Sequence, residues 1–254
     1  MKPYFSFIKK EFLEHWRTYK ILILAAVFLL LGMMGPIIAK ITPDLINSLP
    51  TNGIVITMPP PTAMDSWMQF FQNMGQLGLI VIVIVFCGIM ATELNKGTLT
   101  NILTKGMRRG TVILSKLTVA TLLWILSYLL ALAVCYAYTA YFWPMGNLHN
   151  VFIAFFSMWL YGELLITLVI LGGILFKNIY GSLLTAGGAV VVMSLINIAP
   201  KLQKYNPINL GGNNTPLLQA QKSVSDVAPA IYVCTALIIV VMAASIVIFN
   251  KKQL

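Results

Sequence analysis

Long apolar segments alternate with short polar ones along the whole chain. A run of about 18 or more apolar residues is long enough to cross a bilayer as a helix. Six runs meet this length, at residues 21–39, 68–91, 113–141, 151–175, 179–199 and 228–249. We therefore predict an all-α membrane protein with six transmembrane helices.

The chain begins with a segment, residues 1–20, whose apolar positions recur at helical spacing. These positions are Phe5, Ile8, Phe12 and Trp16, and basic residues fall on the other side. A basic helix with an aromatic apolar face is typical of the membrane interface. We expect an interfacial helix with a partner inside the protein; the alternative is an anchor that contacts nothing else.

Four amides share one helical face in the first half of the second apolar run: Gln69, Gln72, Asn73 and Gln76. Their spacing of i, i+3, i+4 and i+7 places them together, and amides that face lipid are costly. One interpretation is a polar wall along a candidate substrate path or a dimer seam. The other is an external interfacial helix that precedes a span beginning near residue 77.

Glu163 stands alone near the middle of the fourth apolar run. A carboxylate inside a membrane is a candidate for a substrate path, where it would bind a cation or carry a proton. The alternative is a protonated or hydrogen-bonded Glu that joins neighbouring spans through Tyr, Ser or Thr. No basic residue lies at a matching depth in the apolar runs, and this favours the alternative.

Composition agrees with a membrane protein and charge indicates its orientation. The chain is 59% hydrophobic and 9% charged, whereas a soluble domain carries roughly a quarter charged residues. If both termini are cytoplasmic, 13 of the 17 Lys and Arg residues lie on the cytoplasmic side, as the positive-inside rule expects. We predict a multi-pass protein of the cell membrane with cytoplasmic termini and no nucleic-acid partner.

Sequence patterns for catalysis are missing. The chain has no GxxxxGK[ST], HExxH or GxSxG pattern, so it lacks the phosphate loop that binds ATP and the common hydrolytic motifs. The three cysteines lie inside apolar runs without metal-ligand spacing and are expected to act as small apolar residues. We expect a chain that is not an enzyme and that holds no metal or cofactor itself.

The loop at residues 92–112 is polar and basic and separates the second and third apolar runs. An acidic residue, a Gly-Thr pair, a short amphipathic segment and two arginines follow one another. The residues that define this pattern are Glu93, Gly97, Thr98, Leu103, Arg108 and Arg109. A short cytoplasmic helix held at the membrane surface between two spans is predicted.

This pattern resembles the coupling-helix region of ABC-2-type transporter permeases. There a Glu, a Gly-Thr-Leu, a Leu-Leu-Thr-like turn and a basic residue precede a span that opens with a Lys, here Lys116. The family usually has Pro before the basic residue, where this chain has Lys105-Gly106-Met107. The rest of the likeness is architectural and covers the whole chain.

The resemblance implies a single ABC-2-type transmembrane domain over residues 1–254. Its parts would be an interfacial helix at 1–20, spans 1 and 2 at 21–91, a coupling loop at 92–112, spans 3 to 6 at 113–249 and a cytoplasmic tail at 250–254. Short external helices would precede the sixth span, with residues 215–222 as the best candidate. Thr98 would be the N-cap of the coupling helix.

The resemblance also implies a function and partners. The chain would be the permease subunit of an ATP-driven ABC exporter, assembled with a second permease copy or a paralogue and with two copies of an ATPase subunit that binds ATP and Mg. Nearly charge-free spans favour an amphipathic substrate such as a peptide, toxin or drug. The alternative is a non-transporting membrane assembly or sensor subunit that uses the basic loop to bind a partner.

Overall fold

The computed structural model describes residues 2–47, 59–104, 106–146 and 148–252. Six helical segments in these ranges are long and apolar enough to cross a membrane: Lys20–Ile46, Ala63–Asn95, Arg109–Phe142, Val151–Phe176, Ile179–Ile196 and Val224–Lys251. The prediction of an all-α membrane protein with six transmembrane helices is confirmed.

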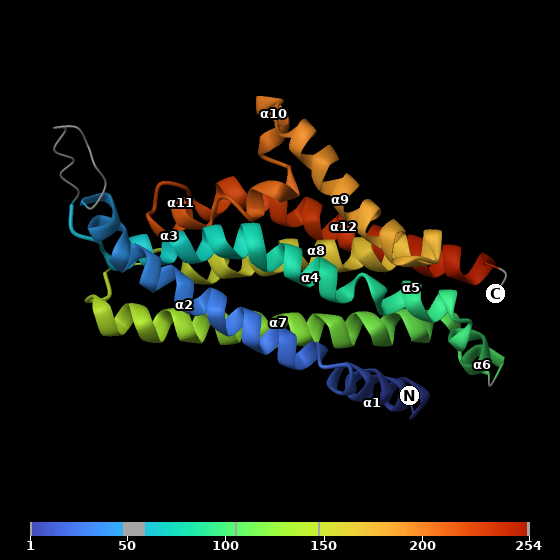
Figure 1. Cartoon of the computed structure of the whole chain (residues 1–254). Helices are drawn as coiled ribbons and strands as arrows, with labels where there is room; N and C mark the ends of the chain where they lie inside the picture. Colours follow the sequence, from blue (N-terminus) through green and yellow to red (C-terminus); the bar gives the residue numbers. More distant parts are fainter. Residues whose placement is uncertain (1, 48–58, 105, 147, 253–254) are drawn as a thin grey trace.

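The second span is built from several elements and the others from one helix each (Figure 1). Helix α1 (Lys2–Arg17) lies ahead of α2 (Lys20–Asn47), the first span. The second span consists of α3 (Ala63–Asn73), the π-helical turn η1 (Met74–Gly78), α4 (Leu79–Phe86) and α5 (Gly88–Asn95). The remaining elements are α6 (Thr98–Thr104), α7 (Arg109–Phe142), α8 (Val151–Phe176), α9 (Ile179–Ile196), α10 (Pro200–Gln203), η2 (Pro207–Leu210), α11 (Asn214–Leu218) and α12 (Val224–Lys251).

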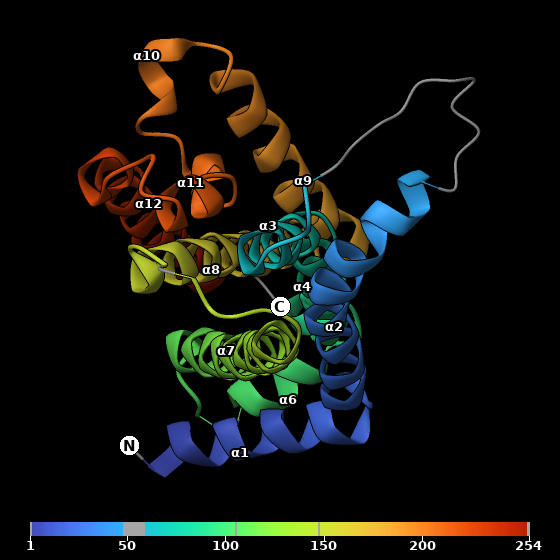
Figure 2. The ribbon, with the colours of Figure 1, turned by 90° about the vertical axis from the view of Figure 1, so that its left-hand side faces the viewer.

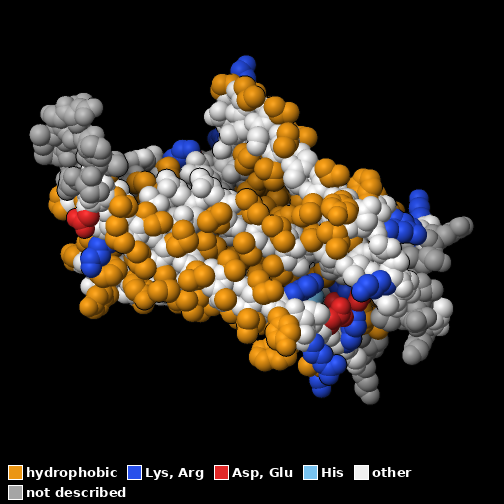
Figure 3. Space-filling model, in the orientation of Figure 1, with side chains coloured by type: hydrophobic (Ala, Val, Ile, Leu, Met, Phe, Trp, Pro, Cys, Tyr) orange, Lys and Arg blue, Asp and Glu red, His pale blue; other side chains and the backbone are white. Residues whose placement is uncertain are grey.

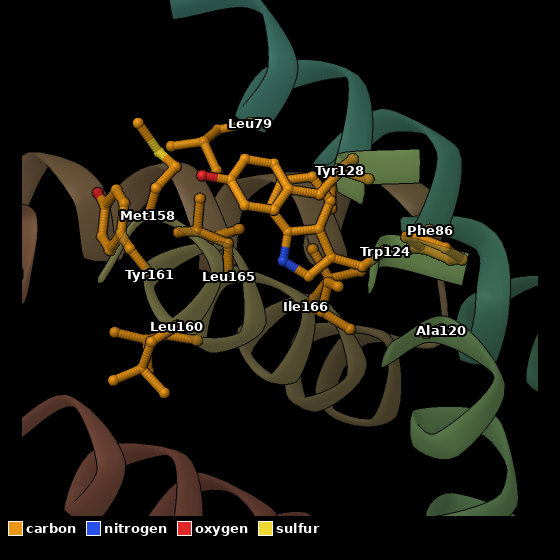
Figure 4. Close-up of a cluster of buried hydrophobic side chains, with 14 of the residues drawn as sticks. Leu79, Phe86, Ala120, Trp124, Tyr128, Met158, Leu160, Tyr161, Leu165 and Ile166 are labelled. Carbon is orange, nitrogen blue, oxygen red and sulfur yellow. The ribbon is translucent and has the colours of Figure 1, made fainter. Parts of the chain in front are cut away.

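Helix α8 is the centre of the bundle. It packs against α4, α5, α7, α9 and α12. In its most apolar stretch of 18 residues 72% is buried, more than in any other described span. Viewed along the bundle, α8 lies over α7, with α2 to one side and α12 to the other (Figure 2). Trp124 and Tyr128 of α7 meet Leu165 and Ile166 of α8 in the apolar core (Figure 4).

The largest departures from the predicted boundaries are at the end of the first span and the start of the second. Residues 40–47, expected in a loop, continue α2 through Pro36 and Pro43, which membrane helices tolerate because neighbouring groups satisfy the freed carbonyls. The second span begins at Ala63 rather than at residue 68 and has 33 residues. At 1.5 Å per residue it is about 50 Å long, so it exceeds the hydrocarbon thickness of about 30 Å.

The close packing of α2 on α7 depends on Gly32. A Cβ at this position would lie 2.5 Å from the Ala131 carbonyl oxygen of α7, whereas a Cβ at Gly188 in α9 meets nothing within 4 Å. Small residues at helix contacts allow such approach in membranes, where packing rather than hydrophobicity holds helices together.

We expect Gly32→Ala to lower the melting temperature of the detergent-solubilised protein, because overpacking costs about 1–3 kcal/mol. Gly188→Ala is the matched control and should leave it unchanged or raise it slightly, since Ala is the better helix former. Fluorescence-detected size-exclusion chromatography after heating measures both. Equal effects of the two changes would contradict the assigned contact.

Candidate functional site

Five charged side chains meet at the end of the bundle where both described chain ends lie (Figures 1 and 3). We call Lys10, Glu11, Glu14, Glu93 and Lys116 the charge cluster. Lys10 Nζ lies 3.0 Å from Glu11, 2.7 Å from Glu14 and 2.7 Å from Glu93. Lys116 Nζ lies 2.8 Å from both Glu11 and Glu93.

The charge cluster joins three parts of the chain that are far apart in sequence. Glu93 belongs to the last turns of α5, Lys116 to the first turns of α7, and Glu11 to α1. The chain reverses between α5 and α7, which brings Glu93 and Lys116 to the same level. The side chains of Glu11 and Lys116 are each 1% exposed, so α1 is held to both spans by buried ion pairs.

Charge balance within the cluster keeps its outer members ionised at neutral pH. Burial opposes the charge on Lys10, but its hydrogen bonds to Glu14 and Glu93 outweigh burial and raise its pKa above the usual value. Burial likewise opposes the charge on Glu14, and the bond to Lys10 outweighs it and lowers the pKa of Glu14. Carboxylate oxygens of Glu11, Glu14 and Glu93 lie within 4.8 Å of one another, a spacing suited to a metal ion. Each is paired with a lysine, so lysines already supply the positive charge there.

Helix α1 presents a different face to the protein than its apolar spacing indicates. Its buried stripe is Phe7, Glu11 and His15, at intervals of four residues. Of the four residues expected on the apolar face, Ile8 and Phe12 are half-buried against the core. The other two, Phe5 and Trp16, are 63% and 65% exposed. Sequence reasoning missed Glu11, although its spacing from Phe7 and His15 was the available signal.

His15 lies beside the charge cluster as a neutral side chain. It is 2% exposed, and its ring packs against Phe86 with centroids 6.0 Å apart. Neither ring nitrogen has a hydrogen-bond partner among the described residues. Burial, aided by the positive charges of Lys20 and Lys116, lowers the pKa of His15 to about 3.

The predicted short helix in the 92–112 loop is α6, which projects beyond the ends of α5 and α7 (Figure 1). Gly97 and Gly106 flank it with φ of +66° and +87°, a left-handed conformation that favours glycine at helix ends. Leu99 is buried and Leu103 half-buried, so these two side chains fix α6 to the bundle.

The prediction that Thr98 is the N-cap of the short helix is wrong. It is the first residue of α6, and its hydroxyl donates to the Glu93 carbonyl at 3.3 Å. The hydroxyl therefore satisfies a carbonyl at the end of α5, since the last carbonyls of a helix have no partner within it.

The two arginines that follow α6 have different surroundings. Arg109 donates to the carbonyls of Phe249, Asn250 and Lys252 at 2.6, 3.1 and 2.6 Å, and Lys252 in turn donates to the carbonyls of Ile174 and Leu175. These contacts, which we call the carbonyl clasp, join the ends of α7, α8 and α12.

Arg108, in contrast, is exposed at the start of α7. Only Arg108 of this pair is thus presented to the surface by the described structure.

The structure separates the residues of the candidate substrate path. Gln72 and Gln76 are exposed and line a groove of about 720 Å³ beside α9. Gln69 and Asn73 are half-buried and are not among the residues that line it. The amides lie in a helix continuous with the span through η1, rather than in a separate external helix.

Glu163 faces α7 and not the groove. Thr121 donates to its Oε1 at 2.5 Å, and the residue is 6% exposed. This is the hydrogen bond between neighbouring spans that the second interpretation of Glu163 expected. Its other oxygen is buried without a hydrogen-bond partner among the described residues.

Comparison with known proteins supports the membrane assignment at a general level. No family model matches the chain. An uncharacterized transmembrane protein, YxlG, of Bacillus subtilis (strain 168) is 19% identical over 216 residues, which cover 83% of each chain. The chain is a multi-pass membrane protein.

We expect Lys116→Met to destabilise the protein strongly. The change leaves Glu11 and Glu93 buried without the shared ammonium, and an uncompensated buried charge costs about 3–5 kcal/mol. Thermal stability in detergent measures the loss, with Lys96→Met, an exposed lysine near α6, as the matched control.

Adding Glu11→Gln to Lys116→Met should restore part of the stability, because it removes one of the two buried carboxylates that lost the Lys116 ammonium. A double-mutant cycle measures the coupling. Strictly additive effects of the two changes would contradict the ion pair between Glu11 and Lys116.

We also expect His15 to make stability depend on pH. Its folded pKa of about 3 lies below the unfolded value of about 6.5, so the unfolded chain binds the proton first. This contribution to stability is complete above pH 6.5 and is lost as the pH falls toward 3. The loss reaches about 2 kcal/mol at pH 5.

His15→Phe should therefore flatten the decline in melting temperature between pH 7.5 and 5.0, a range above the usual titration of carboxylates. His149→Phe is the matched control, since His149 is the other histidine and is exposed. The same decline in wild type and His15→Phe would show that His15 is not neutral in the folded state.

Proposed function

We propose that the chain is the permease subunit of an ATP-driven ABC exporter and that α6 is the helix that contacts a separate ATPase. The observation that carries the proposal is the position of α6. It is short, lies between two spans and projects beyond the bundle (Figure 1). A partner that moves this helix would move both spans, because one turn joins it to each.

The charge cluster gives the proposed coupling a second route. Glu93 is 8% exposed and paired with Lys10 and Lys116, so it is not available for direct contact with an ATPase. Its proposed part is indirect: it transmits displacement of α5 and α6 to α1. Arg108 remains the side chain that would meet an acidic surface of the partner, because Arg109 is engaged in the carbonyl clasp.

The proposed orientation places α6 and both chain ends in the cytoplasm. Both described ends lie at the same end of the bundle as α6 (Figure 1), and 13 of 17 Lys and Arg residues then lie on the cytoplasmic side. At the same end, the outward-facing Phe5 and Trp16 of α1 would insert into the membrane interface.

The proposed assembly contains two ATPase subunits and a second permease copy or a paralogue. ATP and Mg would bind to the ATPase. Helices α9 and α12 are the least buried of the described spans, with 22% and 17% of their most apolar 18-residue stretches buried. In the proposed assembly they supply surface for lipid or for the second permease. The proposed cargo is an amphipathic peptide, toxin or drug.

A pull-down of the tagged protein from its native membrane, with mass spectrometry of the captured proteins, tests this proposal. We expect a stoichiometric P-loop ATPase. Arg108→Glu should reduce its capture about tenfold or more, since a rim charge reversal opposes an acidic partner surface. Lys251→Glu is the matched control, because Lys251 is an exposed base at the same end, and it should leave capture unchanged.

Capture of the chain without an ATPase would overturn the exporter proposal. Capture of a different protein that depends on Arg108 would favour the alternative, a membrane assembly or sensor subunit. Equal loss of the ATPase in Arg108→Glu and Lys251→Glu would reject α6 as the contact and leave only a general effect of charge.

A further inference from the structure

Helix α9 leans away from α3 and α4 along one side of the bundle (Figures 1 and 2). Residues of these three helices, with others of α8, line a groove there. Its volume is about 720 Å³, within the range of roughly 300–1,000 Å³ that is usual for small-molecule sites. Leu79, Tyr161 and Leu165, whose side chains Figure 4 draws, line it from α4 and α8, and Leu183 and Val190 line it from α9.

The groove is somewhat longer than one leaflet of a bilayer is thick. Along the second span its lining extends from Phe71 to Ile84, a rise of about 20 Å at 1.5 Å per residue. Half of a hydrocarbon core of about 30 Å is about 15 Å. The groove is therefore long enough to accommodate an acyl chain that spans one leaflet.

One end of the groove is polar but uncharged. Gln72 and Gln76 are both exposed there, and each amide can donate and accept hydrogen bonds. The described lining contains no charged side chain, so the groove offers a charged head no counter-ion, whereas it offers a hydroxyl or amide head two amide partners.

We propose that this groove binds a single-chain amphiphile whose head is uncharged and carries hydroxyl or amide groups. The inference rests on the proposed exporter function for the direction in which such a molecule moves, and it specifies the substrate class. The chain contacts the apolar walls, and the head exchanges hydrogen bonds with Gln72 and Gln76.

A second groove on the bundle provides an internal contrast. It has a volume of about 600 Å³ and lies between α7 and α8, where Phe152, Phe156 and Trp159 line it. Its lining has no amide, and the Tyr128 hydroxyl already donates to the Phe155 carbonyl at 3.3 Å. The Trp159 indole nitrogen is buried, so this second groove can hold a chain but has no exposed amide to bind a head.

Adjacent glycines of α9 provide a matched pair of variants. Gly187 lines the groove and Gly188 does not, and a Cβ at either position meets nothing within 4 Å. Gly187→Trp should fill the groove without displacing the backbone, and Gly188→Trp should place the same side chain outside it.

The experiment uses the full chain in nanodiscs without any ATPase. The probe is 1-palmitoylglycerol with a diazirine in the chain and a terminal alkyne, and mass spectrometry maps the photolabelled residues. We expect labelling at residues 80–84 and 183–190 in wild type and Gly188→Trp, and labelling lower by about tenfold, or about 1.4 kcal/mol of binding, in Gly187→Trp. Unlabelled 1-palmitoylglycerol should compete better than palmitate or palmitoylcholine.

Changing both Gln72 and Gln76 to Leu tests the head site. This variant should keep the label but lose the preference among the three competitors, while Gln69→Leu, outside the groove, should keep the preference. Unchanged preference in the double variant would overturn the assignment of the head to these amides.

Two other occupants have distinct outcomes, and both overturn the proposal. Equal labelling of the two Trp variants, spread over the outward face of α9, would indicate bulk lipid. A change in oligomeric state confined to Gly187→Trp, without a change in labelling, would indicate a second copy of the chain. Because no ATPase is present, absence of labelling rejects the groove proposal and leaves the exporter proposal to its own pull-down.

Discussion

The ammonium group of Lys116, buried between the carboxylates of Glu11 and Glu93, is the interaction on which this end of the molecule depends. Without it, among the described residues, the buried carboxylates of Glu11 and Glu93 would keep only the half-buried Lys10 as a counter-charge, and no ion pair would join α1 to α7. Buried ion pairs contribute little net stability but are demanding in geometry. Lys116 therefore determines where α1 lies more than how firmly it is bound.

The same ion pairs connect α6 mechanically to the rest of the bundle. Glu93 precedes α6 and Lys116 follows it, and both pair with α1: Glu93 with Lys10, and Lys116 with Glu11. Beyond this level, the carbonyl clasp joins α7 to α8 and α12 through Arg109 and Lys252. Displacement of α6 has two polar routes into the bundle, one toward α1 and one toward the central helix α8.

The sequence predicted the six spans and the short helix of the loop because long apolar runs and a glycine-flanked polar segment are local signals. Pairing is not local. Glu93 and Lys116 were singled out only as parts of the loop pattern, and nothing in their spacing indicated that they pair. Glu11 was hidden in a helix whose apolar residues fall on two faces. Helix α1 has apolar residues both on the face that packs against the protein and on the face that points away from it. Hydrophobic spacing alone therefore could not predict which face is buried. The separation of Gln72 and Gln76 from Glu163 likewise depends on how α8 is rotated.

The π-helical turn at Met74–Gly78 divides the second span into two helical registers. A π-turn accommodates one extra residue in an α-helix, and one residue corresponds to a rotation of about 100°. Relative to a regular helix, everything from Ala63 to Asn73 is turned by that amount, including Ser66, which bonds Thr139 of α7 at 2.7 Å. A relative that lacks this one residue would keep the same apolar profile along the span yet direct different side chains toward α7 and α9. Divergence among such proteins can therefore proceed by a single-codon deletion that no hydropathy profile detects.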